Sequence, residues 1–350
     1  SGIRGVVEQG DDPGQLIVDL SGSYGGSSET LWHADGWLEP RNRRGQLTLK
    51  ADKFTFDRIA NVLDQSMVQD FTDTSVDAEV LIEVDKGAAD ISGQLNISGL
   101  NLQHPMLAEE TMRDISFNSA LVASLDSKAR SVGLVSLDLE SKGVKYQLSG
   151  ELALAGGLES NGRRRVEPRL RAHVVVPKAP CQAVLESIPA EFVPKLQGFV
   201  LGGFFQADVN LEVDWSDLQE ATVLDGFVDL PKCKVLEPSE EFNAERLMSS
   251  FQHQILVGPE EYEMVDIGME SDDYAQIFDI ASPFLNAVLT QEDSRFYDHE
   301  GFIPREFKSA LVRNLEAGRF KFGASSITMQ MVKNVFLYRD KTISRKLQEL

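Results

Sequence analysis

The side chains best suited to chemistry are gathered between residues 292 and 349, in three short blocks. The first block, residues 292–301, reads EDSRFYDHEG; the second, residues 323–334, reads GASSITMQMVKN; the third, residues 345–349, reads RKLQE. Together they offer carboxylates that can accept a proton, and Lys and Arg side chains that can bind phosphate oxygens. These residue types therefore predict general-base chemistry on a substrate that carries phosphate.

Glu292 is the candidate general base of the first block. Apolar residues at 284, 285, 288 and 289 predict a helix that ends at Glu292 and presents its carboxylate at the mouth of a cleft. A solvated helix end is the alternative for this residue taken alone. His299 lies seven positions later, and for it a structural hydrogen bond is favoured over a catalytic role.

The second block is predicted to be a turn followed by a helix. Gly323 allows a tight entry, and Ser325 or Ser326 is the expected N-cap. From Ser326 on, Gln330 and Lys333 recur at helical spacing and form one polar stripe. The N–H groups of a helix N-terminus suit phosphate oxygens, and Lys333 adds a full charge. An ordinary amphipathic helix is the alternative.

The third block places two cations and a carboxylate on one helix face, because Arg345 and Lys346 lie four and three residues before Glu349. The functional interpretation is a cationic clamp on a pyrophosphate, with Glu349 orienting the cations or holding a divalent metal. Mg²⁺ suits such a site, since it binds through few carboxylates plus phosphate oxygens. Surface ion pairs of little energetic value are the alternative.

In this order and at this spacing, the three blocks resemble the first three motifs of the peptidoglycan glycosyltransferases, whose lysozyme-like domain polymerises lipid II. The resemblance implies that Glu292 deprotonates the 4-hydroxyl of the acceptor N-acetylglucosamine, and that polyprenyl pyrophosphate leaves as a stable anion held by cations. It implies catalytic roles for Glu292 and Glu349. It implies substrate-binding roles for Asp293, Ser325, Gln330, Lys333, Asn334, Arg345 and Lys346, and structural roles for Phe296, His299, Gly301 and Gly323.

The second block departs from the family pattern at three positions. Ala324 replaces the second glycine of the turn, Ser326 replaces the usual threonine, and Met329 replaces the first glutamine of the usual pair. The serine is a conservative change, whereas Met329 removes an amide and any polar contact that the amide would make. None of the three changes affects a charged group.

The resemblance also carries expectations about setting. It implies lipid II and the growing glycan strand as substrates, a membrane surface and other cell-wall synthesis proteins as partners, and a divalent cation, Mg or Mn, as cofactor. The expected location is the periplasmic face of the bacterial inner membrane, with an anchor upstream of this chain. The likeness covers about residues 270–350, and the family's domain continues further, so this chain is expected to be a fragment with little activity by itself.

Two other functions are compatible with the chain. One is a non-catalytic envelope scaffold or lipid-binding protein with a degenerate transferase segment; the retained Glu292, Lys333, Arg345, Lys346 and Glu349 argue against degeneration. The other is a lytic enzyme that cleaves the same glycan, which would need a protonated carboxylic acid rather than a pyrophosphate clamp. The basic cluster makes the lytic enzyme the weaker hypothesis.

The elements that must position these blocks change character along the chain. Residues 1–176 alternate apolar and polar residues over strand-like lengths between Gly-, Asp- and Asn-rich breaks, which predicts a β-rich envelope or scaffold domain. One helix is expected near residues 54–65. The pattern of long alternating strands separated by polar turns in this region is loosely similar to the β-rich repeats of AsmA-type envelope proteins. A groove for a lipid chain and a sheet packed on its own core are the two interpretations, and alternating strands by themselves favour the second.

The remainder is predicted as a mixed α/β connector over residues 177–270 and the N-terminal part of an all-α, lysozyme-like glycosyltransferase domain over residues 271–350. The expected fold class is therefore α+β and multidomain. Between the first two blocks, residues 302–322 mix phenylalanines with Arg and Lys. That mixture suits either an interfacial segment beside an anionic bilayer or a helix and loop packed on the core.

Charge and cysteine content limit the partners and the compartment. The net charge is −21; residues 281–350 hold 11 basic and 8 acidic side chains, so the other 280 residues hold 23 basic and 47 acidic ones. Such an acidic body repels nucleic acid. The chain has two cysteines. Cys181 and Cys233 could form one disulfide in an oxidising compartment or remain two buried thiols, and their spacing leaves both alternatives open.

Overall fold

The structure is a computed structural model that describes residues 2–23, 30–59, 63, 66–70, 72–158, 164–239, 242, 244–258, 261–272, 274–299, 301–319, 321–337 and 342–350. The chain divides into two compact units. The first comprises residues 1–192 and 202–234, and the second comprises residues 193–201 and 235–350. The division into three segments at residues 176 and 270 stays a prediction.

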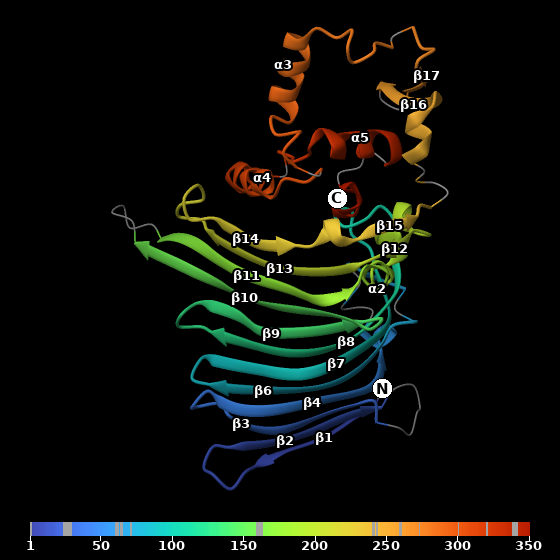
Figure 1. Cartoon of the computed structure of the whole chain (residues 1–350). Coiled ribbons are helices and arrows are strands. Elements are labelled where there is room, and N and C mark those ends of the chain that lie inside the picture. Colours follow the sequence, from blue (N-terminus) through green and yellow to red (C-terminus); the bar gives the residue numbers. More distant parts are fainter. Residues whose placement is uncertain are drawn as a thin grey trace. The chain divides into compact units, whose positions relative to one another are not determined.

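The first unit is built on one antiparallel sheet that has 13 strands among the described residues, most of them adjacent in chain order (Figure 1). Its strands are β1 (Gly2–Gln9), β2 (Leu16–Ser23), β3 (Trp32–Glu39), β4 (Arg44–Thr55), β5 (Val68–Gln69), β6 (Ser75–Asp85), β7 (Ala88–Leu102), β8 (Met112–Asp126), β9 (Ser131–Ser141), β10 (Val144–Leu158), β11 (Arg164–Pro180), β13 (Phe204–Asp214) and β14 (Val223–Val228). The order is β1-β2-β3-β4-β6-β7-β8-β9-β10-β11-β13-β14, and β5 pairs with β7.

Tight hairpins connect neighbouring strands of this meander. Lys86-Gly87 links β6 to β7 and Lys142-Gly143 links β9 to β10, each as a two-residue loop between directly paired residues. Both residues of each loop have a positive φ, 50° and 103° in the first and 48° and 82° in the second. Turns of this kind match the twist of antiparallel strands, and glycine adopts such backbone angles readily.

The α+β fold class expected from the sequence is wrong, because antiparallel sheet dominates the described residues. The predicted mixed connector supplies β13 and β14 to the same sheet. The apolar side chains of β13 stay in register with those of β11, as in the pair Val209–Val174, so β13 lengthens the sheet and starts no new layer. The predicted connector also contains the seven-residue helix α2 (Cys181–Ser187).

Near residues 54–65, where one helix was expected, the structure has the single 3₁₀ turn η1 (Phe56–Ile59). Residues 60–62, 64 and 65 of that prediction lie outside the described residues. Further short 3₁₀ turns are η2 (Ala190–Phe192), η3 (Pro194–Leu196), η4 (Leu230–Lys232) and η5 (Ala244–Met248). A two-stranded sheet pairs β12 (Val200–Gly202) with β15 (Lys234–Glu237).

A small core lies where α2 packs on the ends of β10, β11 and β13. Val144, Val176 and Ala207 are buried there. The Tyr146 hydroxyl is 2.5 Å from Ser187 Oγ, and burial raises the pKa of the Tyr146 phenol. Cys181 at the start of α2 forms a disulfide with Cys233, which closes a separation of 52 residues within the first unit.

Loss of the disulfide is expected to destabilise the first unit. A crosslink over 52 residues removes enough conformational entropy from the unfolded chain to stabilise the fold by about 4 kcal/mol. The three tryptophans, at 32, 37 and 215, all belong to this unit, so urea unfolding of the Cys181→Ala/Cys233→Ala variant can be followed by their fluorescence. An unchanged unfolding midpoint would contradict the prediction.

The second unit contains a β-hairpin, β16 (Phe251–Gly258) with β17 (Glu261–Ile267), followed by four α-helices among its described residues. These are α3 (Ser282–Glu292), α4 (Pro304–Ala317), α5 (Ile327–Phe336) and α6 (Ile343–Glu349). Phe242 stacks on Phe336 of α5 at 4.2 Å between ring centroids, and its edge meets Phe199 at 5.5 Å. In the described part of the chain, no helix combines the length and apolar character needed to cross a bilayer.

Candidate active site

Glu292 is the last residue of α3, and its carboxylate reaches α5. The helix begins with Ser282-Pro283, where proline is tolerated in the first turn. It stops because Asp293 leaves the helical conformation, with φ −162° and ψ 77°. Glu292 Oε2 accepts a hydrogen bond of 3.0 Å from Gln330 Nε2, and the Glu292 side chain is exposed. The first and second blocks therefore meet at the predicted base.

Asp293 joins the same two blocks from a buried position. Its carboxylate lies 3.0 and 3.1 Å from His299 Nε2 and accepts the backbone N–H of Ile327 at 3.1 Å. His299 Nδ1 accepts the backbone N–H of Gly301 at 2.9 Å. Since Nδ1 accepts, the ring hydrogen lies on Nε2 and is donated to Asp293. Several donors of this kind are what a fully buried carboxylate requires.

Ser326 caps α5 and fixes the turn that precedes it. Its hydroxyl accepts the backbone N–H of Met329 at 3.2 Å and donates to the backbone carbonyl of Gly301. With the bond from Ile327 to Asp293, two of the N–H groups at this helix end are satisfied within the protein. The contacts tie the end of the first block to the start of the second.

Two glycines of the site differ in backbone conformation. Gly301 has φ +99°, a left-handed conformation that is unfavourable for residues with a Cβ. Gly323 is absent from the described residues with positive φ, and a Cβ added to it would meet nothing within 4 Å. The left-handed geometry therefore requires glycine at residue 301 and places no such demand on residue 323.

This contrast provides a matched pair of variants. Gly301→Ala is expected to lower the free energy of unfolding by about 1–2 kcal/mol, because alanine is strained at this φ. Gly323→Ala is expected to change it by less than about 0.5 kcal/mol. Thermal unfolding followed by circular dichroism at 222 nm measures both changes. Equal shifts for the two variants would rule out backbone strain at Gly301.

The third block forms a buried ion cluster. Glu349 has a fully buried side chain; its Oε1 accepts from Arg345 Nη1, and its Oε2 accepts from Lys346 Nζ at 2.9 Å. Ser325 Oγ lies 2.7 Å from Lys346 Nζ and donates to Glu349 Oε2 at 3.2 Å. Arg345 and Lys346 are only 13% and 27% exposed. Thr342 caps the helix by accepting the N–H of Arg345 at 3.0 Å.

The environment of Glu349 does not fit a divalent cation in this arrangement. Both carboxylate oxygens are bonded to cationic or hydroxyl donors, whereas a metal would need them free. Among the described residues, no group of three or more His, Cys, Asp and Glu side chains is placed to hold a metal. The divalent cation stays a prediction.

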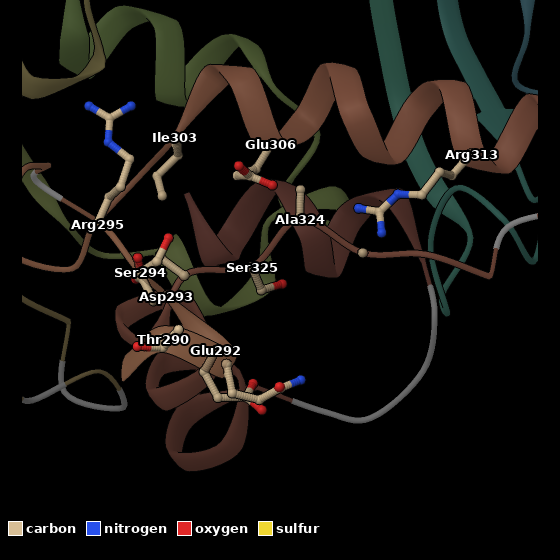
Figure 2. Close-up of a pocket in the computed structure, with 13 residues that line it drawn as sticks. Thr290, Glu292, Asp293, Ser294, Arg295, Ile303, Glu306, Arg313, Ala324 and Ser325 are labelled. Atoms are coloured by element: carbon tan, nitrogen blue, oxygen red, sulfur yellow. The ribbon is translucent and has the colours of Figure 1, made fainter. Parts of the chain in front are cut away.

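A pocket of about 320 Å³ lies between the end of α3, α4 and the turn before α5 (Figure 2). Glu292 and Asp293 line it from the first block, and Ser325 and Ser326 from the second. Arg295, Glu306 and Arg313 line it as well. The pocket thus has the candidate base on its wall and two arginines that can attract an anionic substrate.

Glu306 and Arg313 are pocket residues that the motifs do not include. Both lie on α4, which starts at Pro304 and ends at Ala317, and Gly318 caps the helix with φ +60°. Arg313 was visible in the sequence as one of several basic residues between 302 and 322, with nothing to set it apart from the others. Only the packing of α4 against the motif segments shows which of them line the pocket.

Asn314 is a second residue that the motifs do not include. Its Oδ1 accepts the N–H groups of Lys321 and Phe322, both at 2.8 Å, and its Nδ2 donates to the Phe322 carbonyl at 2.8 Å. Three hydrogen bonds from one side chain fix the loop that leads to Gly323. Asn314 thereby positions the turn that carries Ser325.

Three of the predicted site residues lie away from these contacts. Lys333 and Asn334 follow Gln330 on α5 but are not among the residues that line the pocket. The Lys333 side chain is half-buried and Asn334 is exposed. Phe296 is half-buried, with its ring 5.2 Å from that of Tyr297. The structure brings together Glu292 with Gln330, Asp293 with His299 and Gly301, and Ser325 with Arg345, Lys346 and Glu349.

Comparison with known proteins gives a consistent result for the second unit. Residues 261–350 match a family model described as Transglycosylase. Penicillin-binding protein 1A/1B of Bacillus subtilis is 40% identical over 88 residues, which are 25% of this chain and 10% of that protein. The biosynthetic peptidoglycan transglycosylase of Nitrosospira multiformis is 46% identical over 69 residues, 19% of this chain and 30% of that protein. No solved structure gives a significant match.

The match is confined to one part of each chain. Penicillin-binding protein 1B of Vibrio cholerae is 46% identical over 65 residues, 19% of this chain and 8% of that protein. The chain therefore spans less than a third of the length of these three relatives. The matched segment contains all three blocks and the pocket between them. Residues 261–350 of this chain are part of a transglycosylase domain and belong to the peptidoglycan glycosyltransferase family.

Proposed function

We propose that this chain comes from a peptidoglycan polymerase that joins lipid II units into glycan strands, with Glu292 as general base. The observation that carries the proposal is the composition of the pocket. One part of its wall is the exposed carboxylate of Glu292, and another is Ser325, whose hydroxyl is 2.7 Å from the ammonium of Lys346. A proton acceptor and a cation cluster are thus linked to one pocket.

The proposed step needs both groups. The 4-hydroxyl oxygen of the acceptor attacks the anomeric carbon of the donor, and its proton passes to Glu292. A new C–O bond forms while the bond between the anomeric carbon and the pyrophosphate breaks, and the pyrophosphate leaves with the electron pair. Because that group leaves as a stable anion, it requires positive charge and no general acid.

Other residues of the chain position the base and bind the pyrophosphate in this proposal. Gln330 holds the Glu292 carboxylate through the 3.0 Å hydrogen bond and restricts its position. Arg295 and Arg313 offer guanidinium groups to the phosphates inside the pocket. Lys346 and Arg345 contribute positive charge from behind Ser325, where Glu349 orients them. No step is assigned to a metal ion.

The proposed setting is the periplasmic face of a bacterial inner membrane. The donor carries a polyprenyl chain, which stays in the bilayer, so the enzyme must work at a membrane surface. Lipid II and the growing glycan strand are the proposed substrates, and other cell-wall synthesis proteins are the proposed partners.

The proposal is tested with the protein from its complete gene. Labelled lipid II is supplied with and without Mg²⁺, and the products are separated on a gel. Glycan polymer is the expected result. Absence of polymer from a folded protein would contradict the polymerase. In a parallel reaction that is supplied with preformed glycan, shortened products would indicate the lytic alternative.

A further inference from the structure

The two faces of the large sheet in the first unit differ completely in composition. The register places Leu49, Val80 and Gly93 in one row across β4, β6 and β7, and places Lys50, Glu79 and Gln94 in the next. Residues paired across antiparallel strands share a face, and neighbours along a strand lie on opposite faces. The first row therefore belongs to one face and the second row to the other.

The same separation runs through the paired part of the sheet from β2 to β14. Its apolar face consists of Leu16, Val18, Leu20, Ala34, Leu38, Leu47, Leu49, Val80, Ile82, Val84, Ile91, Leu95, Leu121, Leu125, Val132, Leu134, Leu137, Leu139, Leu148, Leu152, Leu170, Val174, Val209, Leu211, Val213 and Leu224, with glycines and alanines between them. Among the described residues, no charged residue occupies a paired position on this face from residue 16 to 154 or from 168 to 228; beyond those limits, Arg164 pairs with Leu158 at the far ends of β10 and β11. The opposite face carries ion pairs such as Lys50–Glu79 at 2.8 Å and Arg169–Asp214 at 2.7 Å.

Within the first unit, the described residues form no second layer over most of the apolar face. Among the described residues, α2 covers it only at the ends of β10, β11 and β13, where the small core lies. Elsewhere large side chains remain open to solvent: Leu49 is 36% exposed, Leu125 43%, Val132 53%, Leu152 43% and Val174 37%. Figure 1 shows the strands of this sheet as long and bowed. With strands about 4.8 Å apart, the face extends for about 50 Å and covers about 1,000 Å².

The polarity of the face selects the kind of partner. A protein interface of this area carries about five to ten hydrogen bonds. Among the described residues, the paired side chains of this face carry three hydroxyls, and all three are bonded inside the unit: Ser119 to the Leu95 carbonyl, Ser141 to the Ser116 carbonyl, and Tyr146 to Ser187. A hydrocarbon chain needs no hydrogen bond and gains from contact with apolar surface alone.

The charge of the unit limits the partner further. The first unit holds 21 basic and 35 acidic residues, a balance of −14. A second copy placed face to face would bring equal negative charge against it. An anionic lipid, including one that carries a pyrophosphate, is disfavoured for the same reason. A zwitterionic lipid adds no net charge.

We propose that the apolar face of the large sheet binds the acyl chains of a diacyl phospholipid with a zwitterionic headgroup, such as phosphatidylethanolamine. The acyl chains lie across the strands against the exposed leucines and valines, and the headgroup remains in water. All the residues involved belong to the first unit, so the inference is independent of the polymerase proposed for the second.

Matched crosslinking positions on one strand test the proposal. A photoreactive benzoylphenylalanine replaces either Leu152, on the apolar face, or its neighbour Glu151, on the charged face. Each 350-residue chain is mixed with vesicles of phosphatidylethanolamine and phosphatidylcholine that contain tritiated acyl chains, and is irradiated. At least tenfold more tritium is expected on the chain labelled at residue 152. Equal labelling at both positions, or none at either, would overturn the proposal.

Two further measurements keep the test decisive. Leu121 and Ala120 of β8 provide a second pair on opposite faces, and the unsubstituted chain should co-elute with the tritiated lipid in gel filtration. Unlabelled phosphatidylglycerol or a prenyl diphosphate should compete at least fivefold more weakly than phosphatidylethanolamine. Stronger competition by either would overturn the headgroup assignment. A crosslink from residue 152 to a second copy of the chain would overturn the proposal that lipid occupies this face, and would indicate self-association instead.

Discussion

Glu292→Gln is expected to lower the rate of glycan polymerisation about a thousandfold, within the range typical of a lost general base. The substitution keeps the size of the side chain and its place at the end of α3. It removes the ability to take up the acceptor proton, because an amide is not a base at neutral pH. The full-length protein is assayed with labelled lipid II, and the initial rate of polymer formation is compared with that of the parent.

The matched control is Asp298→Asn, an acid-to-amide change in the same block at an exposed residue that pairs with Arg295 at 3.6 Å. Its rate is expected to stay within about threefold of the parent, as for a surface ion pair of small energy. If Glu292→Gln kept most of its activity, Glu306 would become the candidate, because it is another carboxylate that lines the pocket.

Glu349→Gln is expected to lower the free energy of unfolding by about 3 kcal/mol, because it leaves Arg345 and Lys346 mostly buried without their shared anion. The isosteric amide retains an acceptor oxygen but no charge. Since the tryptophans lie in the first unit, the measurement is hydrogen exchange of residues 342–350 together with thermal unfolding at 222 nm.

A double-mutant cycle separates the ion pair from simple loss of packing. Lys346→Met removes one cation, so Lys346→Met/Glu349→Gln should be less destabilised than the sum of the two single variants. A coupling energy of about 1–3 kcal/mol is expected for groups in direct contact. A coupling near zero would show that the cluster contributes nothing as a unit and that Glu349 acts through its shape.

The sequence predicted the helices of the site more accurately than it predicted the fold of the rest of the chain. The sequence predicted Ser325 or Ser326 as the N-cap of the second block, and Ser326 caps α5 in the structure. Local patterns of this kind depend on a few adjacent residues. The predicted fold class depended on whether the strand Phe204–Asp214 joins the preceding sheet. That is decided by tertiary pairing, and the sequence of the strand alone does not show which strand it pairs with.

The same limit applies inside the site. The contact between Glu292 and Gln330 joins residues 38 positions apart, and the bond between Asp293 and Ile327 joins residues 34 apart. Spacing within each block could not reveal them. Nor could it show that Arg313 lines the pocket while Lys333 does not, because that distinction is set by how α4 and α5 pack.

The order of strands in the large sheet has a consequence for how the protein is made and how it can change. From β7 to β11 each strand pairs with the one before it, so this part of the sheet has a low contact order and can assemble progressively from its N-terminal end as the polypeptide emerges. Deletion or duplication of one complete hairpin leaves the registers on either side intact. The length of the sheet is therefore a quantity that evolution can adjust in steps of two strands, while the domain that follows keeps its own fold.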